Sequence, residues 1–510
     1  MSTIMSENRR VVKNTILLYF RMILLLCVSL YTSRVILDAL GFVDYGIYNV
    51  VGGVVAMFSF VNMALANSTS RFVTYALGKD DINYSRTVFN ASFKVHLLIA
   101  IVVFILAETV GLWFLHNKLV IPDNRLQIAV WVYHLSVISC LISILYSPFN
   151  AVIIAHEKMG AFAFMSVFEG LLKLSIAFYI SVADFDRLLL YAILLLCASI
   201  ISVFVYFIYC IRNFTEVNFT GRGDLRIIKE ISSFAGWSMI GNLAYIGYTQ
   251  GLNILLNLFF GPQVNAARGI SNQLQGAVMG FVTNFQMAIN PQITKSFAKQ
   301  DFSRLHTLVF SSSKFSFFLL YCIILPISIE VKNILNIWLV DVPKYAIEFT
   351  ILTLYARLID TLSNPIGIAN NATGSIRRYQ IFEGGTLLLI VPVSYLVLRQ
   401  GGSPVSVFWI QLVIMYVTQI VRLFLVCSKI KMSINSYLKN VVLKILPVAL
   451  ISPIFPIVLY KCLNDSFLSM FFVIISSIIS VIMFSFIIGL NKNEKQQVII
   501  RVSSFLKSII

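Results

Sequence analysis

Long apolar runs follow one another along almost the whole chain, separated by short polar stretches. Each run has about twenty residues or more, the length that an α-helix needs to cross the hydrocarbon core of a bilayer. We predict fourteen membrane-spanning helices, over residues 14–37, 45–66, 89–115, 126–154, 160–182, 188–211, 233–260, 265–289, 309–338, 346–369, 380–398, 405–428, 441–461 and 467–490.

The eighth predicted span, 265–289, is much more polar than the others. It carries one arginine and four amides, namely Asn265, Arg268, Asn272, Gln273 and Gln275. Polar groups of this kind would be unsatisfied against lipid, so we expect this helix to line a cavity.

Composition supports a lipid environment. The 510-residue chain is 58% hydrophobic and 12% charged, whereas soluble chains average about 45–50% apolar and about 25% charged residues. The fold class expected is therefore an all-α integral membrane protein. A net charge of +17 would indicate a nucleic-acid partner in a soluble protein, but basic membrane loops explain it here, and we expect no nucleic acid.

The distribution of basic residues predicts the orientation. If the N-terminus is cytoplasmic, the cytoplasmic segments carry 23 Lys and Arg residues and the opposite side carries 6. Cytoplasmic loops of membrane proteins are enriched in these residues. The count therefore places both termini in the cytoplasm and favours an even number of crossings.

Weak internal similarity suggests two halves. Gly41 and Gly261 end the first and seventh spans, and Pro148 and Pro365 lie near the ends of the fourth and tenth. Two six-helix lobes of the same orientation would follow, as in transporters built from parallel repeats. The expected organisation is an N-lobe over 1–211, a cytoplasmic linker over 212–232, a C-lobe over 233–428, and two further helices with a cytoplasmic tail over 429–510.

Motifs of enzymes and metal sites are missing from the sequence. It contains no P-loop, no HExxH, no GxSxG and no paired cysteines, and its five histidines are scattered. We expect no catalytic residues, no metal and no cofactor, so the protein should not be an enzyme.

Ten of the 39 basic residues lie inside predicted spans. A charged side chain is energetically costly inside the bilayer, so each of these positions needs an explanation. Lys94, Lys314, Arg422 and Lys444 lie near cytoplasmic ends, and we expect their charged groups to reach the interface. Two other cations have an acidic neighbour at helical spacing: Lys173 follows Glu169 by four residues, and Arg357 precedes Asp360 by three. Each pair is either structural or functional, and an ion-coupling site is the functional reading of the first.

Arg21, Arg34, Arg268 and Arg357 are the candidates for a cationic cavity, together with Asn272 and Gln273. For Arg34 and Arg268, which lie near the outer ends of their spans, the alternative is that the guanidinium group reaches the interface. Guanidinium groups bind phosphate in a bidentate manner, so the expected substrate is anionic, with pyrophosphate as a good fit. Arg21 and Arg34 are thirteen residues apart, about 220° around an ideal helix. They share a cavity only if the helix bends or the cavity wraps around it.

Five segments carry a family resemblance. They are GFVDYGIYNVVGG (Gly41–Gly53), SPFNAVIIAHEKM (Ser147–Met159), NAARGISNQ (Asn265–Gln273), INPQITKSFA (Ile289–Ala298) and NNATGSIRRYQ (Asn370–Gln380). The chain resembles the Wzx-type O-antigen flippases of the multidrug/oligosaccharidyl-lipid/polysaccharide exporter superfamily over roughly residues 8–430.

The resemblance implies a two-lobed bundle of twelve to fourteen helices in the bacterial inner membrane. It also implies that undecaprenyl-pyrophosphate-linked oligosaccharide, an O-antigen or capsule repeat unit, moves from the cytoplasmic to the periplasmic leaflet by alternating access. A polysaccharide polymerase and a chain-length regulator would be partners, besides membrane lipids. Related lipid II flippases have a cavity arginine followed by a Pro-x-x-x-Lys-Ser-Phe stretch, which Arg268 and Pro291–Phe297 match.

A cation-coupled drug exporter of the same fold is the alternative. It would need a carboxylate for ion coupling, and the candidate groups are Glu108, Glu169 with Lys173, and Asp360. The acidic first-helix residue of drug exporters has no counterpart here, because Asp38 lies at the outer end of its span. A polysaccharide polymerase or ligase is a third possibility, against which the lack of a large external loop argues.

Overall fold

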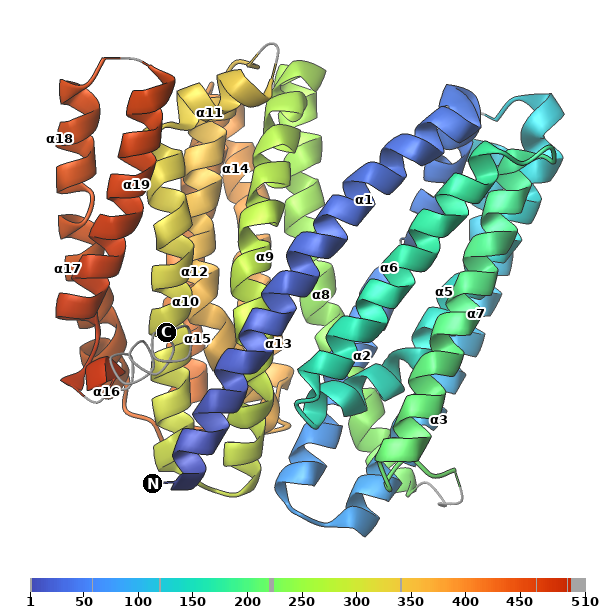
Figure 1. Ribbon diagram of the computed structural model, residues 1–510, viewed down its shortest axis with the longest axis horizontal. Helices are drawn as coiled ribbons and strands as arrows, with labels where there is room; N and C mark the ends of the chain where they lie inside the picture. Colours follow the sequence, from blue (N-terminus) through green and yellow to red (C-terminus); the bar gives the residue numbers. More distant parts are fainter. Residues whose placement is uncertain are drawn as a thin grey trace, which may run out of the picture. The chain divides into compact units, whose positions relative to one another are not determined.

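The structure is a computed structural model that describes residues 2–56, 58–118, 121–219, 224–339, 342–464, 466–492 and 494–496. Within these ranges all regular structure is helical, which confirms the all-α prediction (Figure 1). Each of the fourteen predicted spans falls on one helix or on consecutive helical segments.

The first half of the chain forms seven long helices and two short segments. They are α1 (Ser2–Ala56), α2 (Ser59–Gly78), α3 (Ile82–Leu106), the π-helix η1 (Ala107–Gly111), α4 (Leu112–Lys118), α5 (Asp123–Ala155), α6 (Met159–Ser181), α7 (Arg187–Asn213) and α8 (Leu225–Phe260). The last of these begins inside the stretch 212–232 that the sequence suggested as a linker.

The second half continues with further long helices, several of them in pieces. They are α9 (Pro262–Ala298), α10 (Phe302–Ile329), α11 (Val331–Trp338), α12 (Ala346–Ala372), α13 (Arg377–Leu388), α14 (Ile390–Arg399), α15 (Pro404–Cys427), α16 (Ile434–Tyr437), η2 (Leu438–Val442), α17 (Leu443–Ile451), α18 (Ile454–Cys462), α19 (Phe467–Phe484) and η3 (Ser485–Gly489).

The helices differ strongly in how apolar they are. Among the described residues, nine helical stretches are long and apolar enough to cross a membrane on length and composition alone. The helices α8, α9 and α12 do not reach that hydropathy, although predicted spans coincide with them. Their polar residues must therefore be sheltered by protein or by a water-filled space.

Local sequence explains several helix boundaries. The side chains of Asp81, Asp186 and Asp301 accept hydrogen bonds from backbone N–H groups in the first turns of α3, α7 and α10, as helix N-caps do. Gly41 interrupts α1 with φ 73° and ψ 171°, a conformation that is open essentially to glycine alone. Its counterpart Gly261, with φ 76°, separates α8 from α9.

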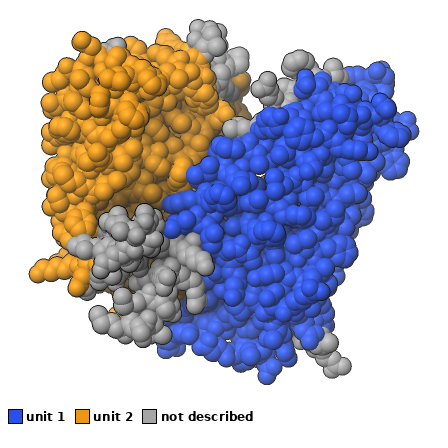
Figure 2. All heavy atoms as spheres, in the orientation of Figure 1, with its two compact units in different colours: residues 1–243, 294–300 blue, residues 244–293, 301–510 orange. Residues whose placement is uncertain are grey.

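The chain divides into two compact units, coloured separately in Figure 2. Unit 1 comprises residues 1–243 and 294–300, and unit 2 comprises residues 244–293 and 301–510. Both α8 and α9 therefore contribute residues to each unit. The C-terminal segments α17 and α19 belong to unit 2, where both pack against α10.

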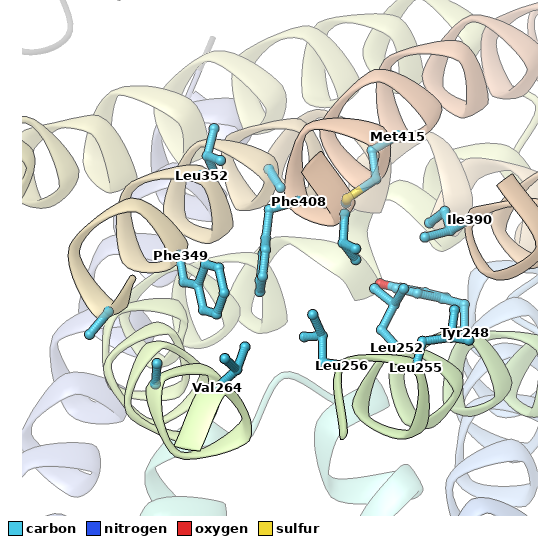
Figure 3. Packing of buried hydrophobic residues seen from close by; sticks show 14 of the residues in the cluster. Tyr248, Leu252, Leu255, Leu256, Val264, Phe349, Leu352, Ile390, Phe408 and Met415 are labelled. Atoms are coloured by element: carbon cyan, nitrogen blue, oxygen red, sulfur yellow. The ribbon is translucent and has the colours of Figure 1, made fainter. Parts of the chain in front are cut away.

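Each unit has its own apolar core. In unit 2, side chains from α8, α9, α12 and α15 interlock, and the rings of Phe349 and Phe408 stack with their centroids 4.1 Å apart (Figure 3). In unit 1, the core joins α1, α5 and α7 through residues such as Val51, Val132 and Tyr191. These cores position the polar side chains that lie beside them.

Candidate functional site

A polar pocket of about 180 Å³ lies inside unit 2. Side chains from α8, α9, α12 and α15 line it, and they include two arginines, Arg268 and Arg357, and five amides. The pocket lies against the apolar core, because Phe408 belongs to both. No carboxylate is among the described residues that line it.

Arg268 is the most exceptional side chain of this pocket. Only 4% of its surface is exposed, and one terminal nitrogen donates a hydrogen bond to the Thr249 carbonyl oxygen at 2.9 Å. Its Nε and the other terminal nitrogen are buried and have no hydrogen-bond partner among the described residues. Leaving a buried donor unsatisfied costs about 1–3 kcal/mol, and more for a charged group. Buried donors without a partner therefore indicate that a ligand binds here.

Arg357 is held differently. Its side chain is buried, and one terminal nitrogen bonds the Asp360 carboxylate at 2.6 Å and the Tyr245 hydroxyl at 3.2 Å. The i,i+3 spacing suggested by the sequence thus produces a real ion pair. Asp360 balances one of the two cations, and Arg268 supplies the excess positive charge.

The sequence predicted only some of the amide side chains that line this pocket. Asn272 lines it as predicted, whereas Gln273 is exposed and does not. Gln250, Asn253 and Gln411 also line the pocket, and sequence reasoning missed them. Their common feature is a polar side chain in an otherwise apolar helix, which the sequence does display.

A second pocket, of about 470 Å³, lies inside unit 1. Residues from α1, α5, α6 and α7 line it, among them Arg21, Glu169 and Lys173. Lys173 donates to Glu169 at 2.7 Å, the pair that the i,i+4 spacing suggested. The guanidinium carbon of Arg21 lies 4.4 Å from the ring centroid of Phe162, and its buried Nε has no described partner.

The described candidates thus fall into two separate pockets. Arg268, Arg357 and Asn272 meet in unit 2, while Arg21 meets the Glu169–Lys173 pair in unit 1. Arg34 belongs to α1, but its side chain lies outside the described residues.

Glu108 lies in neither pocket but within the π-helix η1. Its carboxylate meets Nδ1 of His134 at 3.0 Å, a partner that the sequence did not suggest. The Tyr133 hydroxyl donates to the Ala107 carbonyl oxygen at 2.7 Å. This bond satisfies a carbonyl at the start of the irregular turn.

Two expectations about charged residues are wrong. Lys314 does not reach an interface: its side chain is fully buried and bonds Glu494 at 2.7 Å. Arg422 is also buried, and it pairs with Glu383. In both cases a carboxylate from another segment offsets the cost of burying the cation, so the side chain has no need to extend to water.

Comparison with known proteins identifies the fold. No family model matches the chain, and no curated protein does. Among solved structures, an outward-facing multidrug resistance MATE family transporter of the MOP superfamily matches with a TM-score of 0.69 at 14% identity, covering 83% of this chain and 96% of that chain. The chain has the two-lobed fold of the MATE transporters.

Two other structures with this fold are informative. The MATE transporter ClbM in complex with Rb⁺ matches with a TM-score of 0.68 at 13% identity, covering 84% of this chain and 97% of that one. A MOP superfamily transporter from Pyrococcus furiosus Vc1, whose binding pocket is described as having reverse polarity suggesting a different function, matches with a TM-score of 0.65 at 13% identity. It covers 82% of this chain and 96% of that one.

Proposed function

We propose that this MATE-fold membrane protein is a flippase for undecaprenyl-pyrophosphate-linked oligosaccharide, an O-antigen or capsule repeat unit. It carries the lipid-linked unit from the cytoplasmic to the periplasmic leaflet of the bacterial inner membrane by alternating access, with both termini in the cytoplasm. A polysaccharide polymerase and a chain-length regulator act on the product. The transporter fold and the five family-like segments support this assignment.

The observation that carries the proposal is the pair of unsatisfied donors on Arg268. A pyrophosphate offers several charged acceptor oxygens and no donor at neutral pH. Its separate oxygens can therefore accept hydrogen bonds from Nε and from the free terminal nitrogen of Arg268, whose N–H groups lie on opposite edges of the guanidinium. Arg357 has an unpartnered buried Nε of its own, and the amide groups of the pocket add neutral donors.

The direction of transport agrees with this charge arrangement. A pyrophosphate-linked lipid is anionic, and each elementary charge moved across 100 mV changes its energy by about 2.3 kcal/mol. A membrane that is negative inside therefore favours outward movement of the loaded anion. No nucleotide-binding motif occurs in the sequence, so the potential, an ion gradient or consumption of the product must supply the driving force.

Substitution of Arg268 tests the proposal. In a strain that depends on this gene for surface polysaccharide, Arg268→Gln should abolish surface polysaccharide while the amount of protein in the membrane stays normal. Arg268→Lys should restore little, because an ammonium group cannot donate in a planar fork. Arg399→Gln, which removes an exposed guanidinium of the same unit, is the matched control and should retain activity. Full activity of Arg268→Gln would refute the role.

A cation-coupled drug exporter is the second candidate function. The structural neighbours favour it, since one is described as a multidrug resistance transporter and another was solved with Rb⁺. Glu169, half-buried in the unit 1 pocket, is the carboxylate that would couple transport to a cation. Drug efflux that persists after deletion of the polysaccharide genes and disappears in Glu169→Gln would support this candidate over the flippase.

A further inference from the structure

The unit 1 pocket and the unit 2 pocket differ in their unpartnered hydrogen-bonding atoms. In unit 2, these buried atoms are three guanidinium nitrogens, which are donors, and Thr353 Oγ1, which donates and accepts. In unit 1, they include Asn150 Oδ1, which only accepts, and Thr32 Oγ1, which donates and accepts, besides Arg21 Nε. All three of these side chains line the 470 Å³ pocket. The unit 1 pocket therefore needs a ligand that both donates and accepts.

Charge points the same way. Glu169 lines the unit 1 pocket together with two cations, whereas no carboxylate is among the described lining residues in unit 2. A carboxylate repels a pyrophosphate and offers it no donor, but it accepts hydrogen bonds from hydroxyl groups. Glu169 thus gives the unit 1 pocket a charged acceptor that the described lining of the unit 2 pocket lacks, and this acceptor suits a hydroxyl-rich part of the substrate.

Aromatic rings complete the lining. Tyr146 and Tyr206 face each other with their centroids 5.3 Å apart, and Tyr191 and Phe162 line the same pocket. Apolar ring faces beside a few convergent polar groups are typical of a small-molecule site, and 470 Å³ lies within the usual range of about 300–1,000 Å³. A saccharide presents that combination, because its ring has apolar C–H faces and a rim of hydroxyl groups.

We infer that the unit 1 pocket binds the saccharide of the lipid-linked substrate, with Asn150, Thr32 and Glu169 accepting hydrogen bonds from its hydroxyl groups. This inference rests on the proposed function, in which the unit 2 pocket binds the pyrophosphate.

Two ligands separate the roles of the pockets: undecaprenyl pyrophosphate, which has no sugar, and the lipid-linked oligosaccharide extracted from the cells that make it. Binding of each to the purified full-length protein in detergent can be titrated by native mass spectrometry. Asn150→Ala should weaken binding of the lipid-linked oligosaccharide by roughly three- to tenfold, the usual effect of one lost hydrogen bond. Binding of undecaprenyl pyrophosphate should stay unchanged, which also shows that the variant is folded.

The helix α6 supplies a matched pair of serines. Ser166 and Ser175 both donate to the carbonyl oxygen four residues earlier, at 2.7 and 3.0 Å, but only Ser166 lines the pocket. Ser166→Ala should weaken binding of the lipid-linked oligosaccharide alone, and Ser175→Ala should bind both ligands normally.

The possible outcomes are distinct. If Asn150→Ala weakens both ligands equally, or neither, the saccharide assignment is wrong. If Arg268→Gln leaves the affinity for undecaprenyl pyrophosphate unchanged, the proposed pyrophosphate site fails instead. The selective loss in Asn150→Ala can be measured independently of that result, so the two failures are distinguishable.

Discussion

Substitution of Asp360 should make the protein less stable and at the same time a better binder of diphosphate. Asp360 is the only carboxylate that a described ion pair joins to Arg357, at 2.6 Å. Asp360→Asn keeps the shape of the side chain and removes its charge. Arg357, whose side chain is 6% exposed, is then left as a buried cation beside Arg268 in a pocket that gains one net positive charge.

The magnitude follows from the burial of the pair. Removing one partner of a buried ion pair costs about 3–5 kcal/mol, and the 23% exposure of the Asp360 side chain favours the lower end of that range. The effect on a bound anion has the opposite sign. Two charges about 8 Å apart at an effective dielectric constant of about 20 interact by about 2 kcal/mol, so losing the carboxylate should tighten diphosphate binding about tenfold or more.

The assay is thermal unfolding of the purified protein in detergent, with and without inorganic pyrophosphate. A ligand that binds only the folded protein stabilises it more when its affinity rises. The unfolding temperature of Asp360→Asn should therefore be lower than that of the wild type without pyrophosphate, and pyrophosphate should raise it by a larger amount.

The matched control is Glu383→Gln. It breaks another buried pair of unit 2, with Arg422, but neither residue lines the pocket. This variant should lose stability without any increase in the pyrophosphate response. Equal pyrophosphate responses in Asp360→Asn and Glu383→Gln would refute the electrostatic account of the pocket.

Three further predictions concern stability. Gly41→Ala should lower the free energy of unfolding in detergent by about 1–3 kcal/mol, because φ 73° and ψ 171° suit glycine alone. Removing residues 491–510 takes away the carboxylate that pairs with Lys314 and should cost about 3–5 kcal/mol, most of which Lys314→Met should restore in the shortened chain. Burial acts to raise the pKa of Glu216, but hydrogen bonds from His156 and from its own backbone, together with the charges of His156 and Arg86, outweigh it and leave the pKa below its usual value. Stability from this group is complete above the usual glutamate pKa and is lost as the pH falls through the lowered one, so Glu216→Gln should flatten the acid limb of a pH–unfolding curve.

Local ion pairs could be predicted from the sequence, and distant ones could not. Residues three or four apart lie on the same face of a helix, so the Arg357–Asp360 and Glu169–Lys173 pairs follow from spacing alone. Lys314 and Glu494 are 180 residues apart. Only the packing of the C-terminal helices against α10 decides that they meet. The expectation that Lys314 extends to an interface was wrong for this reason.

The sequence predicted a polar, cationic pocket, but it did not predict that there would be two pockets. The unpaired arginines indicated an anion site, and Arg268 does lie in a polar pocket. Whether Arg21 shares that pocket depends on how the helices associate, which periodicity does not determine. The structure instead gives Arg21 a pocket within unit 1, together with Tyr206 and Glu169.

Three helices that do not qualify as membrane spans by hydropathy build most of the unit 2 pocket. Three of its four walls come from α8, α9 and α12, which are too polar to qualify as spans on composition. This coincidence has a physical cause: polar groups inside a membrane protein are tolerated only where other protein or a water-filled space shields them from lipid. A helix that supplies several polar residues to a pocket must therefore have a lower mean hydropathy.

The fourth wall, α15, still qualifies as a membrane span by hydropathy. It contributes only Gln411 and Phe408 to the pocket, and one amide hardly changes the mean hydropathy over 24 residues. Low hydropathy alone does not identify these helices, because α2 does not qualify either and lines neither pocket. The polar residues that face a pocket, Gln411 among them, have to be sought residue by residue.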